Sequence, residues 1–271
     1  MTDQNARIGI GIVGGSGMLG SAIAVALLER GAVSPHRLWI SNRSGAAAGL
    51  EAWPGVTATR DNQSLAAASD VILLSVPPAR AGEIGLRAEG RLVISVMAGI
   101  TVAEIRRLTG ADRVIRAMSS PAARLGLAYS PWFASPAVTL ADRATATRLF
   151  AACGETDEVA EEGQIDVFTA LTGPIPGFVA YFADCMASYA AGQGIDPAIA
   201  DRAVRQLFRA AGAMLAGGSP TPADHVREMV DYAGTTAAGL RQMEASPLRQ
   251  SIHDGLDAAT RAARALGGPE G

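Results

Sequence analysis

The sequence predicts an α/β domain with a parallel sheet, followed by an all-α domain. From Arg7 to about Thr156, short apolar or β-branched runs alternate with Ala-rich helical segments, which is the pattern of βαβ units. After Glu161 the strand signals stop and helical signals take over. The chain has 271 residues and is 49% hydrophobic, which allows two ordinary domains. We therefore expect one domain over residues 1–157 and a second over 158–271.

The strands predicted for the first domain are short and apolar, as expected of strands that are covered on both faces. They are Ile8–Val13, Leu38–Ser41, Val71–Val76, Leu92–Val96, Val114–Ala117 and Ala137–Thr139. A helix over Arg143–Cys153 is expected to close this domain.

The second half is predicted to contain five or six helices. Three start sites combine a capping residue with Pro at the first helical position: Asp196-Pro197, Thr221-Pro222 and Ser246-Pro247. Phe178, Tyr181, Phe182, Met186 and Tyr189 follow helical i, i+3, i+4 spacing. Such a stripe is typical of a core helix or of a dimer face.

Composition and charge favour small-molecule chemistry. The net charge is −3, and no basic patch is interleaved with aromatic residues, so no nucleic-acid partner is expected. The N-terminus is polar, and the most apolar later stretch, Phe178–Ala191, is short and contains Asp184. We expect a cytoplasmic protein with no membrane partner.

The reactive side chains are few. Cys153 and Cys185 have no CxxC spacing and no partnering His, so no metal site is expected. All 23 basic residues are Arg. The chain therefore has no Lys for a Schiff base, for general acid catalysis or for a phosphate clamp.

A glycine-rich loop carries the main binding signal. It comprises Gly14, Gly15, Ser16, Gly17, Met18 and Leu19, directly after the first strand and before a helical run over Ser21–Glu29. Small residues let the backbone approach a pyrophosphate, and the helix N-terminus supplies free N–H groups. The context predicts a Rossmann-type dinucleotide site, although Ser16 replaces the second glycine of GxGxxG. A tight turn without a ligand is the alternative.

The end of the second predicted strand indicates which cofactor binds. The segment contains Asn42, Arg43 and Ser44 and has no carboxylate for a ribose 2′-hydroxyl. Because Arg can contact a phosphate through two nitrogens, we expect NADP(H). A solvated loop charge is the alternative for Arg43. At the end of the next strand, Val76, Pro77 and Pro78 are expected to line the path to the nicotinamide.

Several segments together resemble the pyrroline-5-carboxylate reductase family, which reduces a cyclic imine with NADPH. They are IGIVGGSGM, SNRS, SDVILLSVPP, LVISVMAGIT, VIRAMSSPAA, DVFTALTGPIPGFVAYFAD and AGTTAAGLRQME, spread from Ile8 to Leu266 in family order. The resemblance implies a Rossmann-type domain, a helical dimerisation domain and a homodimer or higher homo-oligomer. It implies reduction of 1-pyrroline-5-carboxylate to L-proline, the last step of proline biosynthesis.

The resemblance also implies further site residues. Ala98 and Gly99 would contact the cofactor, and Met118, Ser120, Gly173, Pro174 and Gly234 would bind the substrate. The chain departs from the family at Pro77, where Lys is usual, at Met118-Ser119-Ser120-Pro121, which lacks Asn, at Thr172–Gly177, and at Tyr232-Ala233-Gly234, where Pro-Gly-Gly is usual. A reductase of a different imine therefore stays open. So do a deazaflavin-dependent NADP reductase, which shares the glycine loop, and a non-catalytic NADP-binding regulatory protein.

Thr235 and Thr236 are the candidate catalytic residues. Reduction of a C=N bond requires an oriented imine, a hydride from the cofactor and one proton delivered to nitrogen, and a hydroxyl suffices for that proton. In the resemblance, Thr236 matches the proton donor and Thr235 a neighbouring substrate contact. Both open a helix predicted over Thr235–Met243, whose first turn has free N–H groups for a carboxylate. The alternative is that Thr235 only caps this helix.

Overall fold

The computed structural model describes residues 8–173 and 176–267. Contacts divide the chain into two compact units. The first, called the sheet unit, comprises residues 1–174 together with 256–271, and the second, called the helical unit, comprises residues 175–255.

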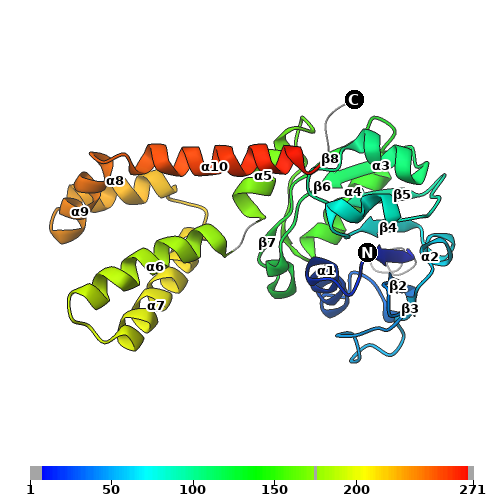
Figure 1. Cartoon of the computed structure of the whole chain (residues 1–271), viewed down its shortest axis with the longest axis horizontal. Coiled ribbons are helices and arrows are strands. Elements are labelled where there is room, and N and C mark those ends of the chain that lie inside the picture. Colours follow the sequence, from blue (N-terminus) through cyan, green and yellow to red (C-terminus); the bar gives the residue numbers. More distant parts are fainter. Residues whose placement is uncertain (1–7, 174–175, 268–271) are drawn as a thin grey trace. The chain divides into compact units, whose positions relative to one another are not determined.

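The sheet unit is built on a seven-stranded sheet with the order β3-β2-β1-β4-β5-β6-β8 (Figure 1). Its strands are β1 Ile10–Val13, β2 Leu38–Ser41, β3 Thr57–Thr59, β4 Val71–Leu74, β5 Leu92–Ser95, β6 Arg113–Ala117 and β8 Trp132–Ala134. All neighbours are parallel except β6 and β8, which pair antiparallel. In the centre, Ile12 of β1 is in register with Ile40 and Leu73. A separate parallel pair joins β7, Ala128–Tyr129, to β9, Gly154–Glu155.

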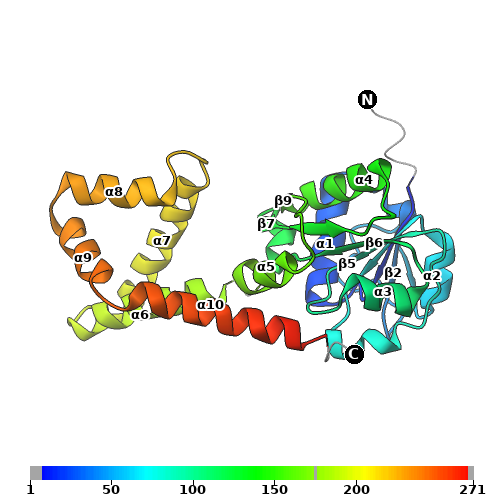
Figure 2. The ribbon, with the colours of Figure 1, turned by 90° about the horizontal axis from the view of Figure 1, so that it is seen from above.

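Helices cover both faces of this sheet (Figure 2). The helices of residues 8–173 are α1 Met18–Glu29, α2 Asn62–Ala68, α3 Val102–Thr109, α4 Leu140–Ala151 and α5 Gln164–Thr172, with 3₁₀ turns η2 Pro35–Arg37, η3 Pro78–Glu83 and η4 Pro121–Leu125. One core cluster packs α1 and α4 against the sheet, and the other packs α2, η3 and α3 against the opposite face. Because both faces are covered, β1 and β4 in the centre of the sheet are apolar along their whole length.

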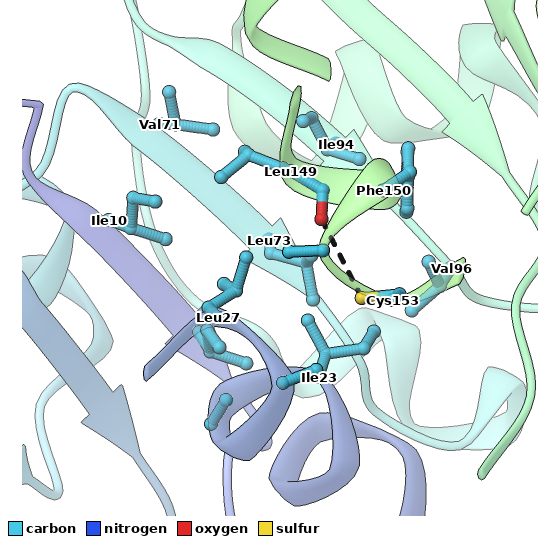
Figure 3. Packing of buried hydrophobic residues seen from close by; sticks show 14 of the residues in the cluster. Ile10, Ile23, Leu27, Val71, Leu73, Ile94, Val96, Leu149, Phe150 and Cys153 are labelled. Carbon is cyan, nitrogen blue, oxygen red and sulfur yellow. Dashed lines mark hydrogen bonds between the residues drawn. The ribbon is translucent and has the colours of Figure 1, made fainter. Parts of the chain in front are cut away.

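Large aliphatic and aromatic side chains fill the α1 and α4 side of the core (Figure 3). Ile23 and Leu27 of α1 meet Leu73 of β4, and Phe150 of α4 is 1% exposed. Full burial of each such side chain stabilises the fold by about 1.5–3 kcal/mol. The Cys153 thiol is also in this cluster and donates to the Leu149 carbonyl at 3.6 Å. Burial raises the pKa of Cys153 to about 12.

The predicted fold class is confirmed, and most predicted strands are found within one or two residues of their expected ends. The strand expected over Ala137–Thr139 is wrong. Thr139 instead caps α4, because its hydroxyl accepts from the Asp142 N–H at 3.2 Å and the Asp142 carboxylate accepts from the Thr139 N–H at 2.9 Å. The strand at this edge of the sheet is β8, which lies earlier in the sequence than the predicted strand, and β3 was not predicted.

The helical unit contains α6 Gly177–Gly192, α7 Pro197–Leu215, α8 Pro222–Tyr232, α9 Thr235–Glu244 and the first part of α10 Leu248–Ala265. The two predicted caps at α7 and α8 are confirmed: the Asp196 side chain accepts from Ala198 and Ile199, and Thr221 forms a capping box with Asp224. At the third start site, the Ser246 hydroxyl accepts from the Leu248 N–H at 3.2 Å.

The contacts group α5 with the sheet unit, whereas the boundary expected from the sequence, 157/158, lies before it. A buried ion pair is one reason. The Arg116 guanidinium, at the carboxyl end of β6, donates to the Asp166 carboxylate of α5, and the side chains are 3% and 10% exposed. Glu162, just before α5, accepts from Arg116 at 3.4 Å and from the Val102 N–H at 2.7 Å.

Candidate cofactor and substrate site

A cavity of about 470 Å³ opens at the carboxyl ends of β1, β2, β3 and β4. After β1 the chain runs outward to β2 and β3, and it returns to the other side of β1 at β4. Open α/β sheets bind ligands at such a reversal of strand order. The cavity is lined by Val13, Gly14, Ser16, Gly17, Ser41, Asn42, Arg43, Arg60, Asn62, Ser75, Val76, Pro77, Arg80, Glu83 and Ile84.

The glycines of the loop let the chain turn tightly from β1 into α1, because side chains at these positions would collide with the protein itself. Gly14 has φ +83°, and a Cβ there would lie 2.3 Å from the Ser75 carbonyl oxygen. A Cβ on Gly20 would lie 2.4 Å from the Gly14 carbonyl oxygen, so glycine lets α1 start directly against the loop. Gly17 is the N-cap and has no side-chain cap. The N–H groups of the first turn, from Met18 onward, are therefore available to an anion.

Arg43 lies on a turn shaped by Asn42. The Asn42 amide oxygen accepts from the Gly45 N–H at 2.7 Å and from the Ser44 hydroxyl at 2.8 Å, while its nitrogen donates to the Ala46 carbonyl at 2.8 Å. Within residues 8–173 and 176–267, the exposed Arg43 guanidinium has no hydrogen-bond or ion-pair partner. A cation held at the rim without a protein partner suits a phosphate ester.

Eight of the lining residues were not predicted as site residues, and four of these eight have charged or amide side chains: Arg60, Asn62, Arg80 and Glu83. Asn62 joins two walls, because its amide oxygen accepts from the Ser41 hydroxyl at 2.6 Å and its nitrogen donates to the Ile84 carbonyl at 2.6 Å. Arg60 and Asn62 follow β3, a strand of only three residues. Recognition of that short strand would have indicated them, because its carboxyl end shares the edge with β1 and β2.

Seven of the predicted cofactor residues line the cavity: Gly14, Ser16, Gly17, Asn42, Arg43, Val76 and Pro77. Gly15, Met18, Leu19, Ser44, Pro78, Ala98 and Gly99 are outside its lining. Gly15 packs beneath the loop, where a Cβ would lie 2.7 Å from the Ile40 Cβ. Gly99 has φ +75°, and a Cβ there would lie 2.6 Å from the Ala263 carbonyl oxygen of α10.

Two predicted substrate residues lie together in the sheet unit. Met118 follows β6, and Gly173 is the C-cap of α5; a Cβ on Gly173 would lie 3.7 Å from the Met118 sulfur. Ser120 is 1% exposed, and its hydroxyl has no hydrogen-bond partner within the described chain. Pro174 lies outside the described residues.

Gly234, Thr235 and Thr236 belong to the helical unit, at the start of α9. The N-cap is Gly234, with no side-chain cap, so the alternative in which Thr235 only caps the helix is wrong. Both threonines are exposed, and neither hydroxyl has a hydrogen-bond partner in the part of the chain that the structure describes. The preceding Ala233 has φ 66° and ψ −170°, a conformation that only glycine adopts readily.

Among the described residues, no group of three or more His, Cys, Asp or Glu side chains could hold a metal ion.

Comparisons with known proteins match both halves of the chain. The family model for pyrroline-5-carboxylate reductase dimerisation matches residues 162–266, and that for NADP oxidoreductase, coenzyme F420-dependent, matches residues 9–99. A pyrroline-5-carboxylate reductase of Thermus thermophilus is 30% identical over 94% of this chain and 98% of that relative. One of Synechocystis is 28% identical over 96% of this chain and 98% of that relative.

A solved pyrroline-5-carboxylate reductase structure from Coxiella burnetii superimposes with a TM-score of 0.85. It is 26% identical, and the match covers 97% of this chain and 99% of that one. The N-terminal match alone is shared with coenzyme F420-dependent oxidoreductases. The similarity to curated reductases extends through both units, so the chain belongs to the pyrroline-5-carboxylate reductase family.

Proposed function

We propose that this chain reduces 1-pyrroline-5-carboxylate to L-proline, the last step of proline biosynthesis, in the cytoplasm. As a member of its family it is an NADP-dependent oxidoreductase that acts on a C=N bond. The observation that carries the proposal is the cavity at the reversal of strand order, which joins an open glycine loop to a cationic rim at Arg43.

The residues of the cavity fit NADP(H). In the proposed site, the N–H groups of the first turn of α1 hold the pyrophosphate, and the loop from Gly14 to Gly17 lines the cavity beside them. Arg43 and Asn42 stand where the 2′-phosphate is expected, and Val76 and Pro77 line the nicotinamide path. When bound, the cofactor supplies the hydride.

The proposed substrate chemistry assigns one role to each threonine. The Thr236 hydroxyl delivers the proton to the imine nitrogen, because it is exposed and has no hydrogen-bond partner within the described residues. The Thr235 hydroxyl and the free N–H groups of the first turn of α9 hold the substrate carboxylate. Neither role requires a Lys, which this chain lacks.

The chain assembles as a homo-oligomer, and we propose a dimer formed by the helical domain, 158–271. No described residue of α6 is buried in the single chain, and Phe178, Tyr181 and Tyr189 are 47%, 73% and 70% exposed. Apolar surface of this extent marks an interaction site. We therefore assign the aromatic stripe of α6 to a dimer face. One of its residues, Phe182, also packs against Phe208 of α7, with 6.4 Å between the ring centroids.

The same apolar character explains a second finding. The segment 164–192, which contains α5, α6 and two residues outside the described ranges, is long and apolar enough by composition to cross a membrane, with a mean hydropathy of 1.3. The stretch lies within the part of the chain matched by the dimerisation model. A face that a second copy covers requires the same composition, so we propose that this stretch serves oligomerisation and that the protein has no membrane partner.

A reductase of a different imine is the second candidate. It is favoured by the altered segment after β6, in which Ser120 is buried and has no hydrogen-bond partner among the described residues, instead of contacting solvent. We propose no nucleic-acid partner.

The test mixes purified protein with NADPH and one cyclic imine at a time, and follows the absorbance of the reduced nicotinamide. The panel contains pyrroline-5-carboxylate, its unsubstituted ring and the six-membered ring with and without a carboxylate. The proposal predicts the highest kcat/KM for pyrroline-5-carboxylate. A higher value for another ring would support the second candidate, and cofactor binding without turnover on the whole panel would indicate a regulatory protein.

A further inference from the structure

The rim of the cofactor cavity carries four charged side chains, of which three are cationic. Arg43, Arg60 and Arg80 line the cavity together with Glu83. The Arg60 Nε donates to the Ser44 carbonyl at 3.1 Å, so that this side chain supports the turn that carries Arg43. The three arginines would attract a 2′-phosphate at this rim, and the negative charge of Glu83 lowers the net positive charge there by one unit.

Arg80 is paired with Glu83 on the rim, and this pair competes with any ligand for the guanidinium. The Arg80 Nε and Nη2 donate to the same Glu83 carboxylate oxygen at 2.8 and 2.5 Å. Both residues lie on η3, where side chains at positions i and i+3 lie one above the other. Pro78 starts this 3₁₀ turn, and the Asn62 side chain binds the Ile84 carbonyl that follows it. The backbone thus keeps the two side chains together.

Glu83 also interacts electrostatically with Arg43, which has no hydrogen-bond partner among the described residues. The hydrogen bond from Arg80 is the main reason that the pKa of the Glu83 carboxyl is lowered, and the charge of Arg43 lowers this pKa further. Glu83 is consequently ionised at neutral pH and within electrostatic reach of Arg43.

We propose that the Arg80–Glu83 pair lowers the preference of this site for NADPH over NADH. Glu83 withholds the Arg80 guanidinium from the 2′-phosphate and offsets part of the attraction that Arg43 and Arg60 exert on it. The pair therefore limits the affinity for NADPH and leaves that for NADH, which has no 2′-phosphate, nearly unchanged. The inference rests on the proposed placement of the cofactor in this cavity.

The test measures the Kd of NADPH and of NADH for the full-length protein carrying Glu83→Gln, Arg80→Gln or both. Removal of one charge a few ångströms from a phosphate changes affinity by about 3- to 10-fold at low salt. Glu83→Gln should tighten NADPH by that factor, and Arg80→Gln should weaken it, because Glu83 is then unpaired. The double variant should bind NADPH within about twofold of the wild type, and NADH should change by less than about twofold throughout.

Glu89→Gln is the matched control, because the Arg87–Glu89 pair has a similar 2.6 Å contact and lies outside the cavity lining. If the ratio of the NADPH and NADH Kd values is unchanged in Glu83→Gln, the inference is overturned, because the pair would then only stabilise η3. Arg43→Ala separates the two proposals. If it weakens both cofactors equally, the placement of the cofactor fails and the inference falls with it. If it weakens NADPH selectively and Glu83→Gln changes nothing, only the inference fails.

Discussion

Arg116 at the end of β6 and Asp166 on α5 form an ion pair that is buried in the sheet unit, with side chains 3% and 10% exposed. The two residues are 50 positions apart in the sequence. Met118 lies two residues after Arg116, and Gly173 ends the helix that carries Asp166, so the pair joins the two segments that bring Met118 and Gly173 together. The ion pair thereby positions two of the residues that the sequence predicts to bind substrate.

Asp166→Asn should lower the free energy of unfolding by about 1.5–3 kcal/mol, because it removes the nearer of the two carboxylates beside the buried Arg116 and leaves only the 3.4 Å contact with Glu162. The measurement is the denaturant midpoint at a fixed protein concentration, which an oligomer requires. Asp112→Asn is the control, since its 2.9 Å pair with Arg106 is exposed, and it should leave the midpoint unchanged. Equal midpoints for the two variants would contradict the positioning role.

Thr236→Ala should lower kcat about 10- to 100-fold with the Kd of NADPH unchanged, because a positioned proton donor contributes at least that much. Steady-state kinetics with pyrroline-5-carboxylate and a separate cofactor titration measure the two quantities. Thr236→Ser keeps the hydroxyl and should recover most of the rate. Thr147→Ala, on the exposed face of α4, is the control and should have no effect. An unchanged kcat in Thr236→Ala would remove this residue from the mechanism.

Arg43→Ala should weaken NADPH by about 10- to 100-fold and NADH by less than about threefold, because charge-assisted hydrogen bonds to the 2′-phosphate are lost. Titration of both cofactors checks this difference. Arg43→Lys keeps the charge but not the planar guanidinium and should lie between the wild type and the alanine variant. Equal losses for the two cofactors would contradict the assignment of Arg43 to the 2′-phosphate.

Ala233→Gly should raise the free energy of unfolding by about 1 kcal/mol. The φ of 66° and ψ of −170° at Ala233 cost about 1–3 kcal/mol for a residue with a side chain, and glycine relieves most of that strain while losing more backbone entropy. Thermal and denaturant unfolding measure the change. Ala238→Gly in the interior of α9 should instead destabilise by about 1 kcal/mol. Similar destabilisation by both substitutions would show that Ala233 is unstrained.

The two cysteines should differ in reactivity. Cys153 is buried with a pKa of about 12, so at pH 8 only about one thiol in ten thousand is ionised. A thiol reagent should modify Cys185 in the native protein and both residues only after unfolding. Because Cys185 lies on α6, its rate should rise on dilution that dissociates the proposed dimer. Rapid modification of native Cys185→Ser protein would contradict the burial of Cys153.

Local sequence determined the features that depend on neighbouring residues. The apolar run Ile10–Val13 followed by glycines predicted a strand, a turn and helix α1, because a covered strand and a phosphate-binding turn require those residue types. Asp196 and Thr221 predicted the starts of α7 and α8, because side-chain caps act within three residues. The same local chemistry was misjudged at Ala137–Thr139, where a capping box outweighs β propensity.

Features that join distant segments were decided by the tertiary structure alone. Arg60, Asn62, Arg80 and Glu83 became cavity residues because the parallel order β3-β2-β1-β4 brings their carboxyl ends to one edge. The ion pair of Arg116 with Asp166 required β6 and α5 to pack, which no periodicity in either segment encodes. A side chain's own sequence neighbours set its local conformation, whereas its charge environment depends on which distant segments the sheet brings beside it.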